Sequence, residues 1–219
     1  MIVTGKKSIA INYKKIINFM RKNFFIIIYF VLLGFIVPNQ VNAYSSDPKQ
    51  FITEIVNEVK KILVEANSKE YKKKKLSEIA TKTADIRGMG FYTLGAYRKE
   101  LTDDQLKEYI ELFEKYFLKS FTSRLTDYSD PKIEVLSAEV LNQKYTIVKS
   151  LLIATDKKPE VKIDWRVYTI NPDKPLIRDL IIEGLSLART QKEEFASVIE
   201  SNNGDVTKLF DSLKEFIVK

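Results

Sequence analysis

The chain contains no cysteine and no histidine among its 219 residues. These absences exclude disulfide bonds, the usual Cys/His zinc sites, Ser-His-Asp and Cys-His nucleophiles, and an imidazole pH switch. Catalysis would have to use carboxylates, lysines, tyrosines or the backbone. We therefore predict a binding protein rather than an enzyme, with no catalytic residue, no metal and no cofactor.

Acidic residues are missing from residues 1–43, which hold six Lys and Arg side chains. The formal net charge of +7 rests mostly on this segment, because the rest of the chain carries 30 basic residues against 29 acidic ones. A nearly neutral remainder argues against nucleic-acid binding, which needs a basic surface.

The basic segment leads into 14 uncharged residues, Phe24 to Val37. As a helix this run spans about 21 Å, less than the roughly 30 Å hydrocarbon core of a bilayer. A basic stretch, a short apolar core and small residues indicate a signal peptide over 1–43, cleaved before Tyr44. A membrane span is the alternative. We predict export to a bacterial periplasm and one domain over 44–219.

Glycine is sparse, and three of the seven glycines, Gly88, Gly90 and Gly95, fall within eight residues. They lack the spacing and the Lys-Ser/Thr end of a phosphate-binding loop, so they predict a chain break or close packing. Before them, Asp47 and Pro48 start a helix whose apolar residues repeat at helical spacing through Ala66. A second helix is predicted from about Lys69 to Arg87.

A capping-box pattern at Thr102 and Gln105 predicts a third helix ending near Asp127, with an unusually aromatic stripe. Four β-rich segments then follow with turn signals between them: 133–141, 144–155, 161–170 and 176–184. Two more helices close the chain, separated by Asn203-Gly204. We predict an α+β fold with helices packed on one face of a curved four-stranded antiparallel sheet.

Two carboxylates, Asp179 and Glu183, lie four residues apart on one predicted strand and could form an acid-base pair. Ordinary cross-strand pairing with Arg166 or its neighbours is the favoured interpretation. Asp85 is interpreted as a helix cap or ion-pair partner. The run Lys72–Lys75 is interpreted as a solvated helix face, with a patch for acidic lipid or an acidic partner as the alternative.

Several blocks resemble the MlaC-like, or toluene-tolerance, family. Residues 85–98 are similar to its "DF…M…VLG.YW+" segment, although Arg98 stands where the family tends to have Trp. Residues 179–187, Asp-Leu-Ile-Ile-Glu-Gly-Leu-Ser-Leu, resemble "DVVIEGVSLV". The resemblance implies an NTF2-like cone and a periplasmic carrier of glycerophospholipid. The implied partners are an inner-membrane ABC transporter with an MCE subunit and an outer-membrane lipoprotein–porin complex.

A soluble carrier has to bury acyl chains in an apolar cavity between helices and sheet, because burial stabilises each CH₂ by about 0.8 kcal/mol. The expected lining residues come from the aromatic stripe, the glycine-rich segment and the strands: Leu94, Tyr109, Phe113, Phe117, Leu151, Ile153, Ile163, Trp165, Val167, Ile181 and Leu185.

Two other classes of protein remain open at this point. An exported NTF2-like enzyme would place an Asp or Tyr inside the same cone, so it predicts an unpaired polar group in the cavity. A structural envelope protein that binds a partner through the Lys72–Lys75 face predicts no cavity.

Overall fold

The structure is a computed structural model that describes residues 44–155 and 159–219. The predicted signal peptide, 1–43, lies outside the described residues. The described residues belong to one compact unit, Tyr44–Lys219.

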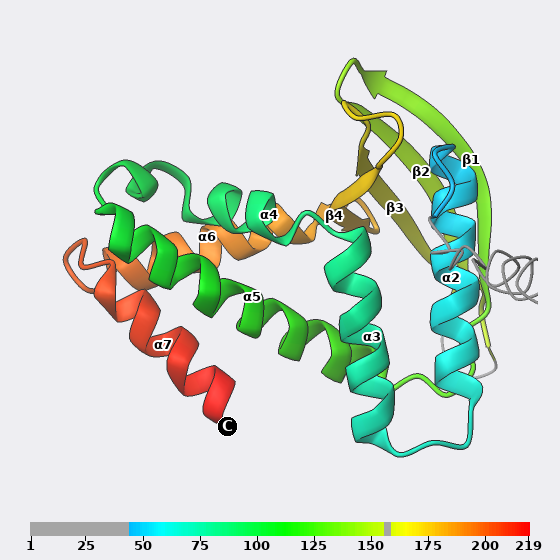
Figure 1. The fold of residues 1–219 in the computed structure, drawn as a ribbon, viewed down its shortest axis with the longest axis horizontal. Helices are drawn as coiled ribbons and strands as arrows, with labels where there is room; N and C mark the ends of the chain where they lie inside the picture. The colour runs from blue at the N-terminus through cyan, green and yellow to red at the C-terminus, as the bar shows by residue number, and fades with distance from the viewer. Residues whose placement is uncertain (1–43, 156–158) are drawn as a thin grey trace, which may run out of the picture. The chain divides into compact units, whose positions relative to one another are not determined.

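Helix α2 (Pro48–Val64) and helix α3 (Lys69–Thr83) form an antiparallel pair beside the sheet (Figure 1). Asp47 caps α2 as predicted, accepting a hydrogen bond from the Gln50 amide at 2.8 Å. The prediction of one helix through Arg87 was wrong, because the backbone at Ala84 and Asp85 pairs with Ile177 of the sheet and interrupts the helix.

Helix α4 (Ile86–Leu94) starts at Asp85, whose side chain accepts a hydrogen bond from the Gly88 amide at 2.9 Å. A short 3₁₀ helix, η1 (Gly95–Lys99), leads to the long helix α5 (Asp103–Leu125), which opens with the predicted capping box. A Cβ at Gly90 would lie 3.0 Å from the Phe113 ring, so glycine allows α4 to approach α5 closely.

The sheet is an antiparallel meander in the order β1-β2-β3-β4-β5. Its strands are Ile133–Asn142, Tyr145–Leu152, Val161–Tyr168, Leu176–Ile182 and Leu185–Ser186. The fifth strand was not predicted. It forms because Glu183 and Gly184 both adopt positive φ angles, 49° and 83°, as a tight two-residue hairpin turn requires.

Helix α6 (Leu187–Glu200) and helix α7 (Thr207–Val218) end the chain. The chain turns between them through Asn203 and Gly204, both at positive φ, as the sequence predicted.

Two clusters of buried side chains hold these elements together. The first lies among α4, α5, α6 and α7 and includes Tyr109, Phe113 and Phe210. The second lies between α2, α3 and the sheet and includes Ile52, Leu76 and Val148. Figure 1 shows α2 and α3 against the curved sheet, with α5 and α7 extending away from it. The predicted α+β class, with helices on a curved antiparallel sheet, is confirmed.

Candidate apolar binding cavity

A cavity of about 490 Å³ lies where the two clusters meet, bounded by α2, α3, α5, the start of α6 and the sheet. Its volume falls within the roughly 300–1,000 Å³ range of small-molecule sites. Most of its lining is aliphatic or aromatic, with contributions that include Ile55, Val59, Leu63, Ile79, Met89, Phe113, Phe117, Phe121, Leu152, Ile163, Trp165, Leu180, Ile182 and Leu187. Such a lining suits a hydrocarbon ligand.

One wall is a row of rings along α5. Phe113, Phe117 and Phe121 stack successively, with ring centroids 6.2 Å and 5.8 Å apart. The spacing of four residues places all three rings on one helix face. The same stripe continues toward the N-terminus of α5 into the closed core.

The opposite wall comes from strands β2 and β3. Ile163 and Trp165 face the cavity. The indole Nε1 of Trp165 donates a hydrogen bond to the Ser150 hydroxyl at 2.9 Å, and that hydroxyl donates to the Ile163 carbonyl at 2.9 Å. The polar edge of the indole is therefore satisfied within the sheet, which leaves its apolar surface for the cavity.

Four of the predicted residues lie on the cavity wall: Phe113, Phe117, Ile163 and Trp165. Three others, Leu94, Tyr109 and Val167, are at most 1% exposed and pack inside the protein rather than lining the cavity. The Tyr109 hydroxyl shares a hydrogen bond with Thr93 at 2.9 Å, and burial raises the pKa of this phenol, so it stays neutral.

The remaining predicted residues lie outside the cavity lining: Leu151, Ile153, Ile181 and Leu185. In β2 it is Leu152 that lines the cavity, and the neighbouring Leu151 pairs with Lys162 on the other face. In β4 a bulge lies opposite Arg166 and Val167. It shifts by one residue the alternation of side chains between the two faces of the sheet. Leu180 and Ile182 consequently face the cavity where Ile181 was expected.

The lining residues that were not predicted come from most of the surrounding elements, and α2 and α3 contribute Ile55, Val56, Val59, Lys60, Leu63, Ile79, Ala80 and Thr83. The repeat of Ile52, Ile55, Val56 and Val59 was visible as a helical face. A repeat of this kind indicates burial, but it does not distinguish a cavity wall from a packed core.

Two carboxylates line the cavity, the exposed Glu194 and the buried Asp179, which is only 3% exposed. Asp179 accepts hydrogen bonds from the Ser186 hydroxyl at 2.6 Å and the Ala188 amide at 3.0 Å, and it forms an ion pair with Arg166 at 3.2 Å. Because Ser186 caps α6, Asp179 ties strand β4 to the start of that helix. The predicted cross-strand pairing with Arg166 is confirmed.

Glu183 is not a partner of Asp179 in an acid-base site. It is exposed in the β4–β5 turn and accepts a hydrogen bond from the Lys162 amide at 2.5 Å. Asp85, interpreted as a cap or ion-pair partner, has both roles, because it also pairs with Arg178. Partial burial opposes the charge of Arg178, but the Asp85 carboxylate outweighs it and raises the pKa of the guanidinium.

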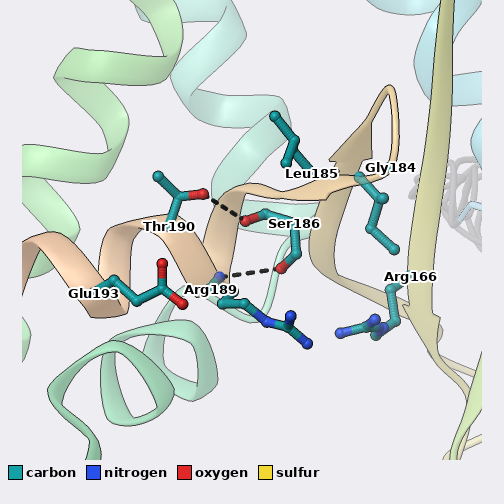
Figure 2. Close-up of a pocket in the computed structure, with 8 residues that line it drawn as sticks. Arg166, Gly184, Leu185, Ser186, Arg189, Thr190 and Glu193 are labelled. Atoms are coloured by element: carbon teal, nitrogen blue, oxygen red, sulfur yellow. Dashed lines mark hydrogen bonds between the residues drawn. The ribbon is translucent and has the colours of Figure 1, made fainter.

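A second hollow of about 350 Å³ lies on the other side of the first turn of α6. Its lining is made up of Arg166, Ile181, Gly184, Leu185, Ser186, Arg189, Thr190 and Glu193. Two of the predicted residues, Ile181 and Leu185, therefore lie here, and Thr190 also lines the apolar cavity. Figure 2 shows the side chains of Arg166 and Arg189 directed toward each other across this hollow.

Within residues 44–155 and 159–219, no group of three or more acidic side chains is placed to hold a metal ion. None of the helices in those ranges combines the length and apolar character needed to cross a membrane.

The fold and the cavity define a small α+β binding domain with an apolar interior site. The chain belongs to the MlaC protein family, whose sequence profile matches residues 50–215. The resemblance inferred from residues 85–98 and 179–187 is thereby confirmed.

The fold is similar to that of a phospholipid-binding protein from Ralstonia solanacearum, solved in complex with a phospholipid. The match has a TM-score of 0.65 at 18% sequence identity and covers 80% of this chain and 97% of the other. No curated protein sequence matches the chain.

Proposed function

We propose that this protein is a phospholipid carrier that holds acyl chains in the apolar cavity. The observation that carries the proposal is the cavity itself, about 490 Å³ lined mainly by aliphatic and aromatic side chains. A well-packed core does not leave a space of this size. Family membership and the phospholipid bound by the Ralstonia protein of similar fold support the same ligand class.

The energetics favour enclosed chains. Burial of each CH₂ contributes about 0.8 kcal/mol, so two chains of sixteen carbons would require on the order of 25 kcal/mol to be exposed to water. The stacked rings of Phe113, Phe117 and Phe121 offer flat apolar surface to such chains without polar atoms. The headgroup can stay at the exposed rim, where Thr190 and Glu194 lie.

Binding rather than catalysis is favoured by the state of the polar groups around the cavity. Asp179 accepts from three protein donors, and the Tyr116 hydroxyl donates to the Gln191 side chain at 2.7 Å. Partial burial also raises the pKa of Tyr116. An exported enzyme that used Asp or Tyr would need one of these groups free to reach its substrate.

The location and partners are part of the same proposal. Residues 1–43 act as a signal peptide, and the domain 44–219 works in the periplasm. It moves glycerophospholipid between an inner-membrane ABC transporter with an MCE subunit and an outer-membrane lipoprotein–porin complex. The family supports this placement, because a water-soluble carrier is required where lipid crosses an aqueous compartment.

Native mass spectrometry tests the carrier function. The full-length chain is expressed in bacteria and the protein purified without detergent, with lipid extraction of the same sample. We expect one phospholipid per chain. Protein that is free of lipid, and stays so after incubation with phospholipid vesicles, would contradict the proposal.

A matched pair of variants locates the site. Ile163→Trp fills the cavity, whereas Lys162→Trp places the same ring on the exposed, opposite face of β3. We expect Ile163→Trp to reduce the bound lipid several-fold and Lys162→Trp to leave it unchanged. Equal occupancy in both variants would place the lipid elsewhere.

A further inference from the structure

We propose that Arg166 and Arg189 form a phosphate site for the phosphodiester of the lipid whose acyl chains fill the cavity. This inference rests on the proposed function. It begins with the geometry of the second hollow, where the two arginine side chains extend toward each other from β3 and from the first turn of α6 (Figure 2). Two like charges directed into one hollow repel each other unless an anion lies between them.

Within the described residues, the protein supplies an anionic partner to Arg166, which pairs with Asp179, but none to Arg189. Asp179 is already engaged by Ser186, Ala188 and Arg166. Glu193 lines the hollow, but it lies beyond ion-pair distance of both guanidinium groups. In the described part of the chain, the Arg189 side chain has no hydrogen bond or ion pair, although its backbone amide donates to Ser186.

Arg166 is the more buried of the two arginines. Its Nε is buried and has no hydrogen-bond partner, although a terminal nitrogen of the same guanidinium pairs with Asp179. A buried donor without an acceptor destabilises a protein by about 1–3 kcal/mol. Because this Nε has no surface exposed to the hollow, an oxyanion there would meet the terminal nitrogens of the two arginines, whose planar forks match phosphate oxygens in geometry.

The position of the hollow indicates which phosphate it would hold. Thr190 lines both the hollow and the apolar cavity, and the Asp179–Ser186–Ala188 network separates them by only the first turn of α6. A ligand with apolar chains in the cavity and an anionic group at the rim would therefore reach both. Every glycerophospholipid carries that phosphodiester, so the site favours phospholipid over uncharged lipid without discriminating among headgroups.

The test compares capture of phospholipid and of diacylglycerol. Protein from full-length expression is delipidated and incubated with phosphatidylglycerol vesicles containing diacylglycerol with the same acyl chains, and the adducts are counted by native mass spectrometry. We expect about a tenfold preference for phosphatidylglycerol. Arg189→Gln should remove most of this preference, because a charge-assisted hydrogen bond to the phosphate is lost. Capture of diacylglycerol should stay unchanged.

Three further variants sharpen the result. Glu193→Gln should increase the preference for phospholipid, because it removes a negative charge from the hollow. Arg98→Gln is the matched control, since Arg98 stacks on Phe91 away from the hollow and its loss should change nothing. Arg124→Gln removes a basic residue that lines the apolar cavity and not the hollow, and a larger loss of preference there than in Arg189→Gln would overturn the assignment.

The outcomes separate the two proposals. If the wild-type protein captures neither lipid, the carrier function itself fails. If it captures both lipids equally, and Arg189→Gln has no effect, the phosphate site is wrong while the carrier stands. If 10 mM inorganic phosphate, tested without lipid, forms an adduct that Arg189→Gln abolishes, and the lipid preference is unaffected, the hollow binds free phosphate instead.

Discussion

The two halves of helix α5 carry the same kind of side chain but have different surroundings. Toward the N-terminus, Tyr109 is 0% exposed and packs against α4 and α7. Toward the C-terminus, Phe117 and Phe121 are only partly buried and line the cavity. One continuous aromatic stripe therefore serves as a closed core at one end and as the wall of a binding site at the other.

The difference lies in what faces the helix. Tyr109 lies close to the ring of Phe210 from α7 and shares a hydrogen bond with Thr93 of α4, so protein atoms fill its surroundings. Phe117 and Phe121 face α2, α3 and the curved sheet across an open space. A binding site for hydrocarbon can therefore be made from core-type side chains where the facing elements do not pack against them.

The largest expected effect is on the closed half. Tyr109→Ala should lower the free energy of unfolding by about 3–5 kcal/mol, because it leaves a cavity in a packed core and removes a buried hydrogen bond. Phe121→Ala should lower it by only about 1–2 kcal/mol, because part of that ring already faces open space. Urea unfolding of lipid-free protein measures both. Equal losses would mean that the two halves are packed alike.

An intermediate effect on stability is expected at Asp179, whose hydrogen bonds link strand β4 to the start of helix α6. Asp179→Ala should destabilise the protein by about 3 kcal/mol, because Arg166 loses its partner and the start of α6 loses an acceptor. Asp179→Asn keeps an acceptor for Ser186 or the Ala188 amide and should be less damaging. Thermal unfolding at neutral pH tests the order. If Asp179→Ala is the milder change, packing alone positions α6.

The smallest expected effect is that of Tyr109→Phe, which should lower stability slightly and leave lipid binding unchanged. Tyr109→Phe removes the hydrogen bond to Thr93 and should lower stability by about 1 kcal/mol, since Thr93 still bonds to the Gly90 carbonyl. Because Tyr109 lies outside the cavity lining, lipid occupancy by native mass spectrometry should stay at the wild-type level. A clear drop in occupancy would show that the closed half also contacts the ligand.

Much of the fold followed from local patterns. The caps at Asp47 and Thr102 and the turn at Asn203-Gly204 have short-range causes, so the residues that form them are close together in the sequence. The break at Ala84 was missed because its cause is long-range, a pairing with Ile177 in β4. The bulge opposite Arg166 and Val167 was missed for the same reason, and it reversed the expected facing of Ile181.

The apolar helix faces, the meander of strands and the family resemblance could be predicted from the order of amino acids, because periodicity, turn chemistry and motifs are local. Whether an apolar face meets protein or a cavity was decided only in three dimensions. Phe113 touches both the closed core and the cavity, and Leu152 lines the cavity where Leu151 does not. These outcomes depend on the curvature of the sheet and the register of its strands, which arise from contacts among segments far apart in the chain.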